Sequence, residues 1–493
     1  MTTHALKLAD AQGHEEDAVV ETSGGPPYEL ALTAPSFGTI RFTADDLIAC
    51  LRQLRERIEP AGWRLLCNGA RRDANASGMQ RDMFGGDVVY VLRPGVEASQ
   101  ADVVPTFGPA PARAIGTLQE QDAFHARWLQ SLRRKGAGSQ GSLAMPRRSP
   151  SFSLGRARGC LLGLAVGDAL GSTTEFAKLQ APPFPRLAAG PHRTMSGGGP
   201  FGLAPGQVTD DTQMAVCLAD SLSARRALDI DDIRKGYRRW ASTAFDIGHQ
   251  TSGVLAVDAA SGTDALRASR DYWVRHGRTP AGNGSLMRTA PIGVAFHSDT
   301  ARATEASLAE SAITHFDPRC RLACAAFNES LARAVGGREP PSPRDLAEAA
   351  HGSLSAALVL LLRETEDADD ETAIKSARDE LAEDLAWARK DDPQLYGDLH
   401  LHKTQGFVRV AFRLAYWELW HAPSFEEALV DVVNRGGDAD TNGAITGALL
   451  GACYGEDAIP KEWSEAVIGA SGSDEYVPER LLRLVEVVAE STA

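Results

Sequence analysis

The feature that most constrains the fold of this chain is a helical spacing of apolar residues that begins near Leu154 and continues to the end of the sequence. Ala, Leu, Arg and Glu recur there at intervals of three and four, and the alternation typical of strands is scarce. Residues 154–493 therefore predict one all-α domain with a single large core. We expect its helices to include residues 212–227, 230–244, 307–335, 343–365, 371–387, 407–420 and 425–433.

The residues before this domain have a different character. Residues 1–27 are polar and end in Gly-Gly-Pro-Pro, which predicts a flexible tail. Residues 28–135 predict a small α+β accessory domain, in which residues 43–58 carry the apolar stripe of a helix capped by Thr43. Its predicted strands lie at residues 28–33, 38–43, 63–67 and 87–92. Residues 136–153 are rich in Gly, Ser and Pro and predict a linker.

Charge and cysteine content narrow the class of protein. Lys and Arg number 51 against 65 Asp and Glu, a net charge of −14, so binding to bulk nucleic acid is disfavoured. The seven cysteines are an odd number and include no Cys-x-x-Cys pair, so a disulfide framework or a zinc ribbon is disfavoured and a reducing cytoplasm fits best. The sequence starts without a signal-peptide pattern, and no apolar run of about 18 residues predicts a membrane span. We therefore expect a cytoplasmic protein with no membrane partner.

Two oxygen-rich clusters, distant in sequence, carry the chemistry. Each combines carboxylates with a threonine hydroxyl at the start of a predicted helix: Thr209, Asp210 and Asp211 in the first, and Asp438, Asp440 and Thr441 in the second. Helix capping explains one oxygen ligand in each cluster, and an Asp-rich turn or a lone calcium loop is the alternative for the second. Mg²⁺ prefers hard oxygen ligands, so the two clusters together predict a two-metal site.

A third motif stands earlier in the chain. The run from Gly167 to Glu175 follows an apolar helix at residues 161–166 and places the Glu175 carboxylate just past a Gly-rich turn. Taken alone this motif is weak, because Gly-rich helix ends are common.

Together with three further motifs, these segments resemble the ADP-ribosylglycohydrolases, a family that includes the dinitrogenase-reductase-activating glycohydrolase. The six motifs occur in the family's order: Gly167-Asp-Ala-Leu-Gly, Thr209-Asp-Asp-Thr, Asp246-Ile-Gly, Gly282-Asn-Gly-Ser-Leu-Met-Arg, Thr314-His315 and Gly437-Asp-Ala-Asp-Thr-Asn. The resemblance covers residues 154–493, and residues 1–150 resemble no family that we recognise.

The resemblance implies an all-helical domain that holds two Mg²⁺ or Mn²⁺ ions. Its metal ligands would be Thr209, Asp210, Asp211, Asp438, Asp440 and Thr441. Glu175 matches an acidic residue that some members place at the metal or reaction centre. Glu175, Asp210 and Asp211 are the candidates for catalytic acid or base.

The resemblance also implies an ADP-ribose site. The loop that would wrap the substrate consists of Gly282, Asn283, Gly284, Ser285 and Met287. His315 matches a histidine near the diphosphate or the distal ribose, and Asp246 and Gly248 belong to a further substrate segment. That segment departs from the family, since His249 stands where members often have Asn. Arg288 suits either a substrate contact or a buried ion pair.

The sequence therefore predicts a metal-dependent hydrolase that removes ADP-ribose from an ADP-ribosylated macromolecule, with ADP-ribosylarginine in protein as the preferred substrate. An alternative is an immunity or binding protein that neutralises an ADP-ribosyltransferase toxin through the accessory domain, with or without hydrolase activity. The accessory domain could instead select a modified substrate or serve oligomerisation or stability.

Overall fold

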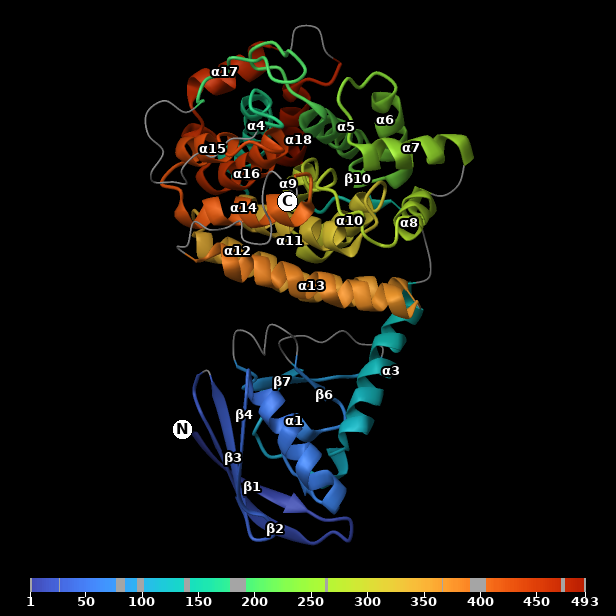
Figure 1. The fold of residues 1–493 in the computed structure, drawn as a ribbon, viewed down its shortest axis with the longest axis vertical. Helices are drawn as coiled ribbons and strands as arrows, with labels where there is room; N and C mark the ends of the chain where they lie inside the picture. Colours follow the sequence, from blue (N-terminus) through green and yellow to red (C-terminus); the bar gives the residue numbers. More distant parts are fainter. Residues whose placement is uncertain are drawn as a thin grey trace. The chain divides into compact units, whose positions relative to one another are not determined.

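The structure of this chain is a computed structural model that describes residues 2–25, 27–76, 85–94, 102–136, 142–177, 192–261, 265–365, 367–390, 405–470 and 475–491. The chain divides into two compact units, Met1–Ser139 with Leu362–Glu366, and Gln140–Leu361 with Asp367–Ala493. Figure 1 shows strands in the first unit and almost only helices in the second. The predicted fold class, an all-α domain preceded by a small α+β domain, is confirmed.

The first unit is built on a five-stranded antiparallel sheet with the order β4-β3-β2-β1-β5. Its strands are β1 (Thr2–Ala9), β2 (Glu15–Thr22), β3 (Tyr28–Ala34), β4 (Gly38–Ala44) and β5 (Arg64–Leu65). Helix α1 (Leu47–Ile58) packs its apolar stripe into one core with side chains of β1 and β3, such as Leu8 and Leu30. The remaining elements are β6 (Ala74–Asn75), β7 (Val88–Val91), β8 (Val103–Pro105), α3 (Leu118–Gly136) and the short 3-10 helices Glu59–Ala61, Asn68–Ala70 and Ala112–Ala114.

The predicted flexible tail at residues 1–27 is wrong. Strands β1 and β2 pair along their whole length, and Leu6, Leu8, Ala18 and Val20 are buried in the core. The physical reason is that these strands bury only alternate side chains, while the outward positions of β2 are mostly acidic. Half-buried strands of this kind have a polar composition, so polarity alone does not indicate a tail.

Two local expectations also need correction. Asp46, not Thr43, caps α1, because the Asp46 carboxylate accepts a hydrogen bond of 2.8 Å from the Ala49 amide and Thr43 lies within β4. Residues 142–153 of the predicted linker are anchored to the helical unit. There β9 (Leu143–Ala144) pairs with β10 (Ala227–Leu228), and backbone bonds of this kind leave no trace in composition.

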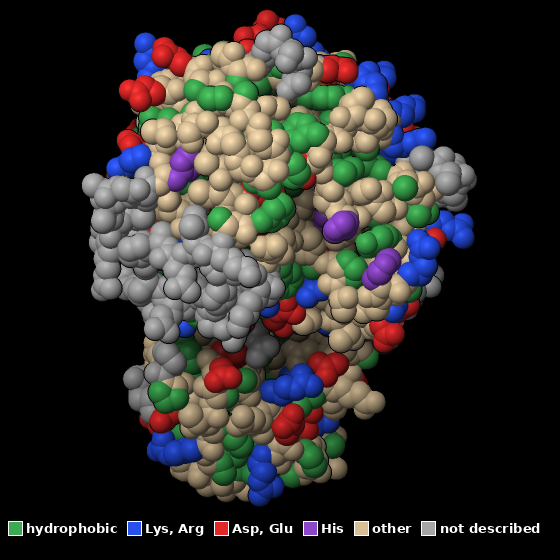
Figure 2. Space-filling view, turned by 45° about the horizontal axis from the view of Figure 1, so that its top comes forward, with side chains coloured by type: hydrophobic (Ala, Val, Ile, Leu, Met, Phe, Trp, Pro, Cys, Tyr) green, Lys and Arg blue, Asp and Glu red, His purple; other side chains and the backbone are tan. Residues whose placement is uncertain are grey.

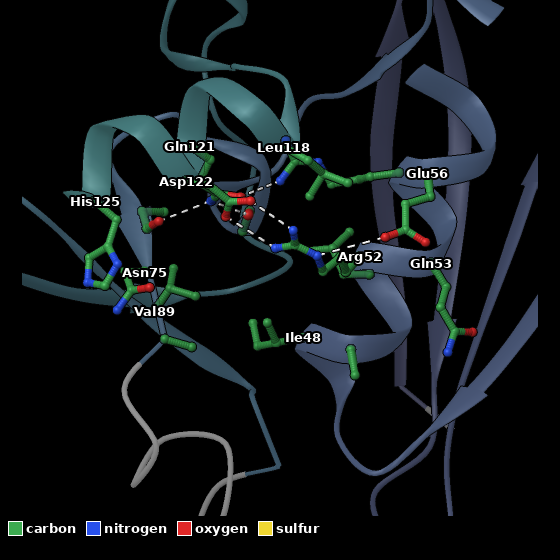
Figure 3. Close-up of a pocket in the computed structure, with 16 residues that line it drawn as sticks. Ile48, Arg52, Gln53, Glu56, Asn75, Val89, Leu118, Gln121, Asp122 and His125 are labelled. Atoms are coloured by element: carbon green, nitrogen blue, oxygen red, sulfur yellow. Dashed lines mark hydrogen bonds and ion pairs between the residues drawn. The ribbon is translucent and has the colours of Figure 1, made fainter. Parts of the chain in front are cut away.

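A cavity of about 350 Å³ lies in the first unit between α1, α3 and the β6–β7 edge. Figure 3 shows Ile48 and Val89 on its apolar side, and Arg52 paired with Asp122 across it. The two nitrogens of Arg52 donate to the two Asp122 oxygens at 3.2 and 2.8 Å. None of the predicted site residues line this cavity.

The second unit is a helical domain with α4 and α16 at its centre. Its helices are α4 (Leu154–Gly171), α5 (Asp210–Arg225), α6 (Ile230–Ala241), α7 (His249–Ser261), α8 (Ala265–Arg275), α9 (Ala290–Ala295), α10 (Thr300–Ser311), α11 (Pro318–Gly336), α12 (Pro343–Glu364), α13 (Ala368–Ala388), α14 (Val408–His421), α15 (Phe425–Val433), α16 (Ala439–Tyr454), α17 (Lys461–Gly469), α18 (Pro478–Glu490) and the 3-10 helix Glu456–Ala458. The single helix predicted at residues 307–335 is wrong. The chain breaks between α10 and α11, because Pro318 starts a new helix that Asp317 caps.

Glycines let the backbones of α4 and α16 touch. A Cβ atom on Gly159, Gly163 or Gly167 would lie less than 3.0 Å from the carbonyl oxygen of Gly451, Gly447 or Gly443, respectively. The paired numbers run in opposite directions, so the helices are antiparallel. In this register the last turn of α4 lies beside the first turn of α16, and Gly171 packs against Ala439.

Helix α12 is long and apolar enough to cross a membrane by length and composition alone. Its buried positions recur every three or four residues, at Leu346, Ala350, Leu354, Ala357 and Leu361. A helix that packs one face on a protein core shows this spacing.

Substituting Gly163 by Ala is expected to lower the free energy of unfolding of the helical unit by about 1–3 kcal/mol, because the new methyl group must push α16 away. Gly155→Ala in the same helix is the matched control, since a Cβ there meets nothing within 4 Å. Urea unfolding of the full chain measures both variants. Equal stability of the two would contradict the role given to backbone contact.

Candidate active site

Three helix ends meet at one buried place in the second unit. The hydroxyl oxygen of Thr209, just before α5, lies 2.9 Å from a carboxylate oxygen of Asp168, 3.1 Å from one of Asp211 and 3.4 Å from one of Asp440. Thr441 adds its own hydroxyl, 3.4 Å from the same Asp211 oxygen. The two clusters that stand far apart in sequence are therefore one cluster in space.

Asp168 in α4 holds the start of α5 in position. Its carboxylate accepts bonds from the Thr209 amide at 3.0 and 3.1 Å, from the Thr209 hydroxyl, and from the amide and hydroxyl of Thr212 at 3.1 and 2.5 Å. The Thr212 amide is one of those that the first turn of a helix leaves unpaired. Asp168 therefore caps α5 from a neighbouring helix.

Capping within each helix does not account for the two clusters. Neither Thr209 nor Asp438, the residues at the N-cap positions of α5 and α16, makes a side-chain capping hydrogen bond. Asp438 instead accepts a bond of 2.6 Å from the side-chain amide of Asn283. The capping alternative therefore fails for the two residues best placed for it.

The cluster has more buried acceptor oxygens than protons to satisfy them. The single hydroxyl proton of Thr209 faces three carboxylates, whereas one oxygen each of Asp211 and Glu175 is buried without a hydrogen-bond partner among the described residues. Carboxylate oxygens of Glu175, Asp438 and Asp440 lie within 4.8 Å of one another. Unpaired buried oxygens are costly, and a set made only of oxygen ligands suits a hard divalent cation.

Burial and mutual repulsion disfavour negative charge throughout the cluster. Burial, followed by the charges of Asp440 and Asp246, raises the pKa of Glu175 to about 11. Burial also raises the pKa of Asp168 and of Asp246 to about 6. It raises the pKa values of Asp210, Asp211, Asp438 and Asp440 in the same direction. A bound cation would remove this repulsion, so the residues present fit a metal.

The loop that begins at Gly282 is fastened to this cluster. Asn283 donates from its side chain to Asp438, and its backbone amide donates to the Gly406 carbonyl at 2.9 Å. The His315 ring lies against the loop, since a Cβ atom on Gly282 or Gly284 would come within 3.1 or 2.9 Å of it. Glycine at these two positions therefore lets the loop pass close to this histidine.

His315 is a buried, neutral ring that supports the loop. Burial, with the charge of Arg288, lowers its pKa well below the ordinary value, and its Nδ1 lies 2.8 Å from the Thr314 hydroxyl. Arg288 is also fully buried, where it pairs with Glu310 at 2.7 Å and donates to the Gly284 carbonyl at 3.1 Å. Of the two roles considered for Arg288, these contacts match the buried ion pair.

The other predicted substrate residues differ in how close they lie to the cluster. Ser285 is fully buried and accepts a bond of 2.9 Å from Ser311, so its side chain faces the core. The Met287 sulfur lies 4.0 Å from the Thr441 hydroxyl, beside the cluster. Asp246 lies near enough to Glu175 and Asp210 for its charge to raise the pKa of both. Gly248 is exposed, and a Cβ atom there would touch nothing.

Sequence reasoning gave Asp168 no role, although it stands within the first motif. The available signal was a carboxylate inside an otherwise apolar helix, at residues 161–170. Such a group is costly to bury unless it is bonded, so its presence indicates specific partners.

The family model of ADP-ribosylglycohydrolases matches residues 149–492, which include the whole cluster. The chain belongs to the ADP-ribosylglycohydrolase family. It is 30% identical to the ADP-ribosylarginine hydrolase Tri1 of Serratia proteamaculans, over 64% of this chain and 76% of that protein. It is 31% identical to the ADP-ribosyl-[dinitrogen reductase] glycohydrolase of Rhodospirillum rubrum, over 62% of this chain and 88% of that protein.

A solved structure described as an ADP-ribosylglycohydrolase-related protein complex is also similar, at 30% identity and a TM-score of 0.50, over 68% of this chain and 98% of that chain. The recognition made from six motifs is thereby confirmed, and this family member is an enzyme that hydrolyses ADP-ribosyl bonds. The family is metal-dependent, and the buried acidic cluster is compatible with that property. The individual roles of the site residues stay predictions.

Replacing Asp168 by Asn is expected to weaken Mn²⁺ binding by about 10-fold or more, because an amide nitrogen cannot accept the bonds that orient Thr209 and Thr212. Calorimetric titration of Mn²⁺ into the full chain measures this effect. Asp231→Asn, on an exposed side chain of α6, serves as the control. Unchanged affinity in Asp168→Asn would contradict the positioning role.

The metal-free protein is expected to lose stability as pH rises from about 4 to about 6, and to keep losing it at higher pH. Asp168 and Asp246 have a pKa of about 6 in the folded chain against an ordinary 3.8, so their protonation favours folding and is lost as pH rises through 6. The other raised carboxyls extend the trend. Saturating Mn²⁺ should abolish or reverse it, as thermal unfolding at several pH values would show. Identical profiles with and without Mn²⁺ would refute the explanation.

Proposed function

We propose that this chain is a metal-dependent hydrolase that releases ADP-ribose from ADP-ribosylated arginine in protein. The observation that carries the proposal is the buried oxygen cluster in which Thr209 faces Asp168, Asp211 and Asp440. The arginine preference is supported by similarity to an enzyme named ADP-ribosylarginine hydrolase. An ADP-ribosylated protein is accordingly the proposed partner.

The proposed metal site holds two Mg²⁺ or Mn²⁺ ions through Thr209, Asp210, Asp211, Asp438, Asp440 and Thr441. When bound, such ions supply positive charge that polarises water and orients hydroxyl groups of the ribose. Glu175 lies against Asp438 and Asp440, so it stands at the edge of the same site.

In the proposed reaction, the bond between the anomeric carbon of the ribose and the arginine guanidino nitrogen breaks, and a bond from that carbon to a water oxygen forms. The water proton goes to a carboxylate, and the leaving guanidino nitrogen receives a proton. The breaking bond gives the ribose oxocarbenium character. Products are free ADP-ribose and unmodified arginine.

Among the three candidates for proton transfer, Glu175 is favoured. One carboxylate oxygen each of Glu175 and Asp211 is buried without a hydrogen-bond partner among the described residues, but the other Asp211 oxygen already accepts from the hydroxyls of Thr209 and Thr441. Burial and the neighbouring carboxylates raise the pKa of Glu175, so it holds a proton at neutral pH in the metal-free chain. Asp210 and Asp211 then serve mainly as ligands.

The Gly282–Ser285 loop would bind the diphosphate through backbone amides. The amide of Gly282 already donates to the Gln250 side chain at 3.3 Å, and that of Asn283 donates to Gly406. Within the described part of the chain, the amides of Gly284 and Ser285 make no such bond. Ser285 is fully buried, so we assign the Gly284 amide to a phosphate oxygen, as in other backbone anion sites.

The alternative, neutralisation of an ADP-ribosyltransferase toxin through the accessory unit, stays a prediction. No feature of the described part of that unit identifies a binding partner. A cytoplasmic location likewise remains a proposal.

The purified chain with Mg²⁺ or Mn²⁺ is expected to release free ADP-ribose from arginine-ADP-ribosylated protein, and EDTA should abolish the release. Asp210→Ala and Asp438→Ala should each reduce the rate by about 100-fold or more, whereas Asp231→Ala on exposed α6 should match wild type. Chromatographic measurement of released ADP-ribose tests all of these. Absence of release from arginine-, serine- and nucleic-acid-linked substrates would refute the proposed function.

A further inference from the structure

Two phenylalanines from distant segments meet on the surface of the helical unit. The ring centroids of Phe201 and Phe245 lie 5.8 Å apart in an edge-on arrangement. The two residues are 37% and 44% exposed, respectively. Exposed hydrophobic side chains are scattered over the face drawn in Figure 2, so exposure alone does not single out a site. Contact between two exposed aromatic rings is more specific, because the two rings together form a surface that one ligand can cover.

Phe201 is held against the turn that carries Glu175. The backbones of Gly198 and Leu203 exchange two hydrogen bonds of 2.8 Å, which close a tight loop around Phe201. Gly199 packs on the backbone of Ser172 so closely that a Cβ atom would overlap it. Thr173 adds a bond of 3.1 Å to the Gly197 carbonyl. The loop that carries Phe201 is therefore anchored to the turn that leads to Glu175.

Phe245 lies on the segment that joins α6 to α7. It follows α6, whose last buried side chain, Trp240, donates a bond of 2.8 Å to Gln213 on α5. It directly precedes Asp246, whose charge reaches Glu175 and Asp210. The aromatic pair thus joins the residue before Asp246 to a loop that packs on the turn leading to Glu175.

An aromatic pair beside a carboxylate is suited to a flat organic cation. A guanidinium group is planar, stays charged, stacks on aromatic rings and pairs with carboxylates. In an ADP-ribosylated arginine, the guanidino group is bonded directly to the reacting ribose carbon, so it must lie beside the cluster. A serine linkage brings no cation to this place.

We infer that Phe201 and Phe245, together with Asp246, bind the guanidino group and aliphatic stem of the modified arginine and thereby select arginine linkages over serine linkages. This assignment rests on the proposed function and names the residues that determine its acceptor. An adenine ring would also stack on phenylalanine, but it belongs to a molecule with two negative phosphates. The neighbouring carboxylate favours the cation over the nucleotide.

The test measures three quantities on the full chain with Mn²⁺: kcat/KM for an ADP-ribosylarginine peptide, kcat/KM for an ADP-ribosylserine peptide, and the Kd of free ADP-ribose. Phe201→Leu and Phe245→Leu keep apolar bulk but remove the ring, and Phe245→Tyr keeps the ring. Tyr454→Leu is the matched control, because Tyr454 is 40% exposed at the opposite end of α16 from the cluster.

Each Leu variant is expected to lower kcat/KM for the arginine peptide by about 10-fold through KM, while the serine rate and the ADP-ribose Kd change less than about 2-fold. Phe245→Tyr and Tyr454→Leu should match wild type. An equal loss of ADP-ribose affinity would overturn the inference by assigning the rings to the nucleotide. Unchanged arginine kinetics would overturn it as well. A wild type that binds ADP-ribose but does not cleave the arginine peptide would instead refute the proposed function.

Discussion

The structure depends on the close contact between α4 and α16. Glycines four residues apart on both helices bring the two backbones together, and any larger side chain at Gly163 or Gly167 would separate them. Close contact at several positions also fixes the antiparallel register. Because of that register, the end of α4, with Asp168 and the Glu175 turn, lies beside the start of α16, with Asp438 and Asp440. The position of the site is a consequence of this packing.

The same contact concentrates negative charge in a buried place, which works against stability. Burial raises the pKa of every carboxyl group in the cluster, and oxygens such as Glu175 Oε2 have no hydrogen-bond partner among the described residues. Asp168 offsets part of this cost, because its five hydrogen bonds replace its lost hydration. Sites that hold strain or unpaired charge are typically functional ones, since a ligand relieves them.

The loops around the cluster have different proposed roles in substrate binding. The His315 ring packs against the loop at Gly282, and Arg288 donates a hydrogen bond to its Gly284 carbonyl. This loop is proposed to bind an anion through its backbone. The Gly-rich loop at Phe201 and the segment at Phe245 offer aromatic surface to a cation. In the proposed assignment, anion and cation recognition flank the oxygen ligands, as a substrate with a diphosphate on one side of the reacting carbon and a guanidino group on the other would require.

The sequence by itself determined the helical class of residues 154–493, the order of the motifs and the two oxygen-rich helix starts, because periodicity and residue chemistry are local properties. It could not determine that Asp168 caps α5, that Thr209 and Asp438 do not cap their own helices, or that Phe201 meets Phe245. Those facts depend on which backbones touch across the core. The same limit explains the error at residues 1–27, where pairing with a sheet, not composition, decided that polar segments become strands.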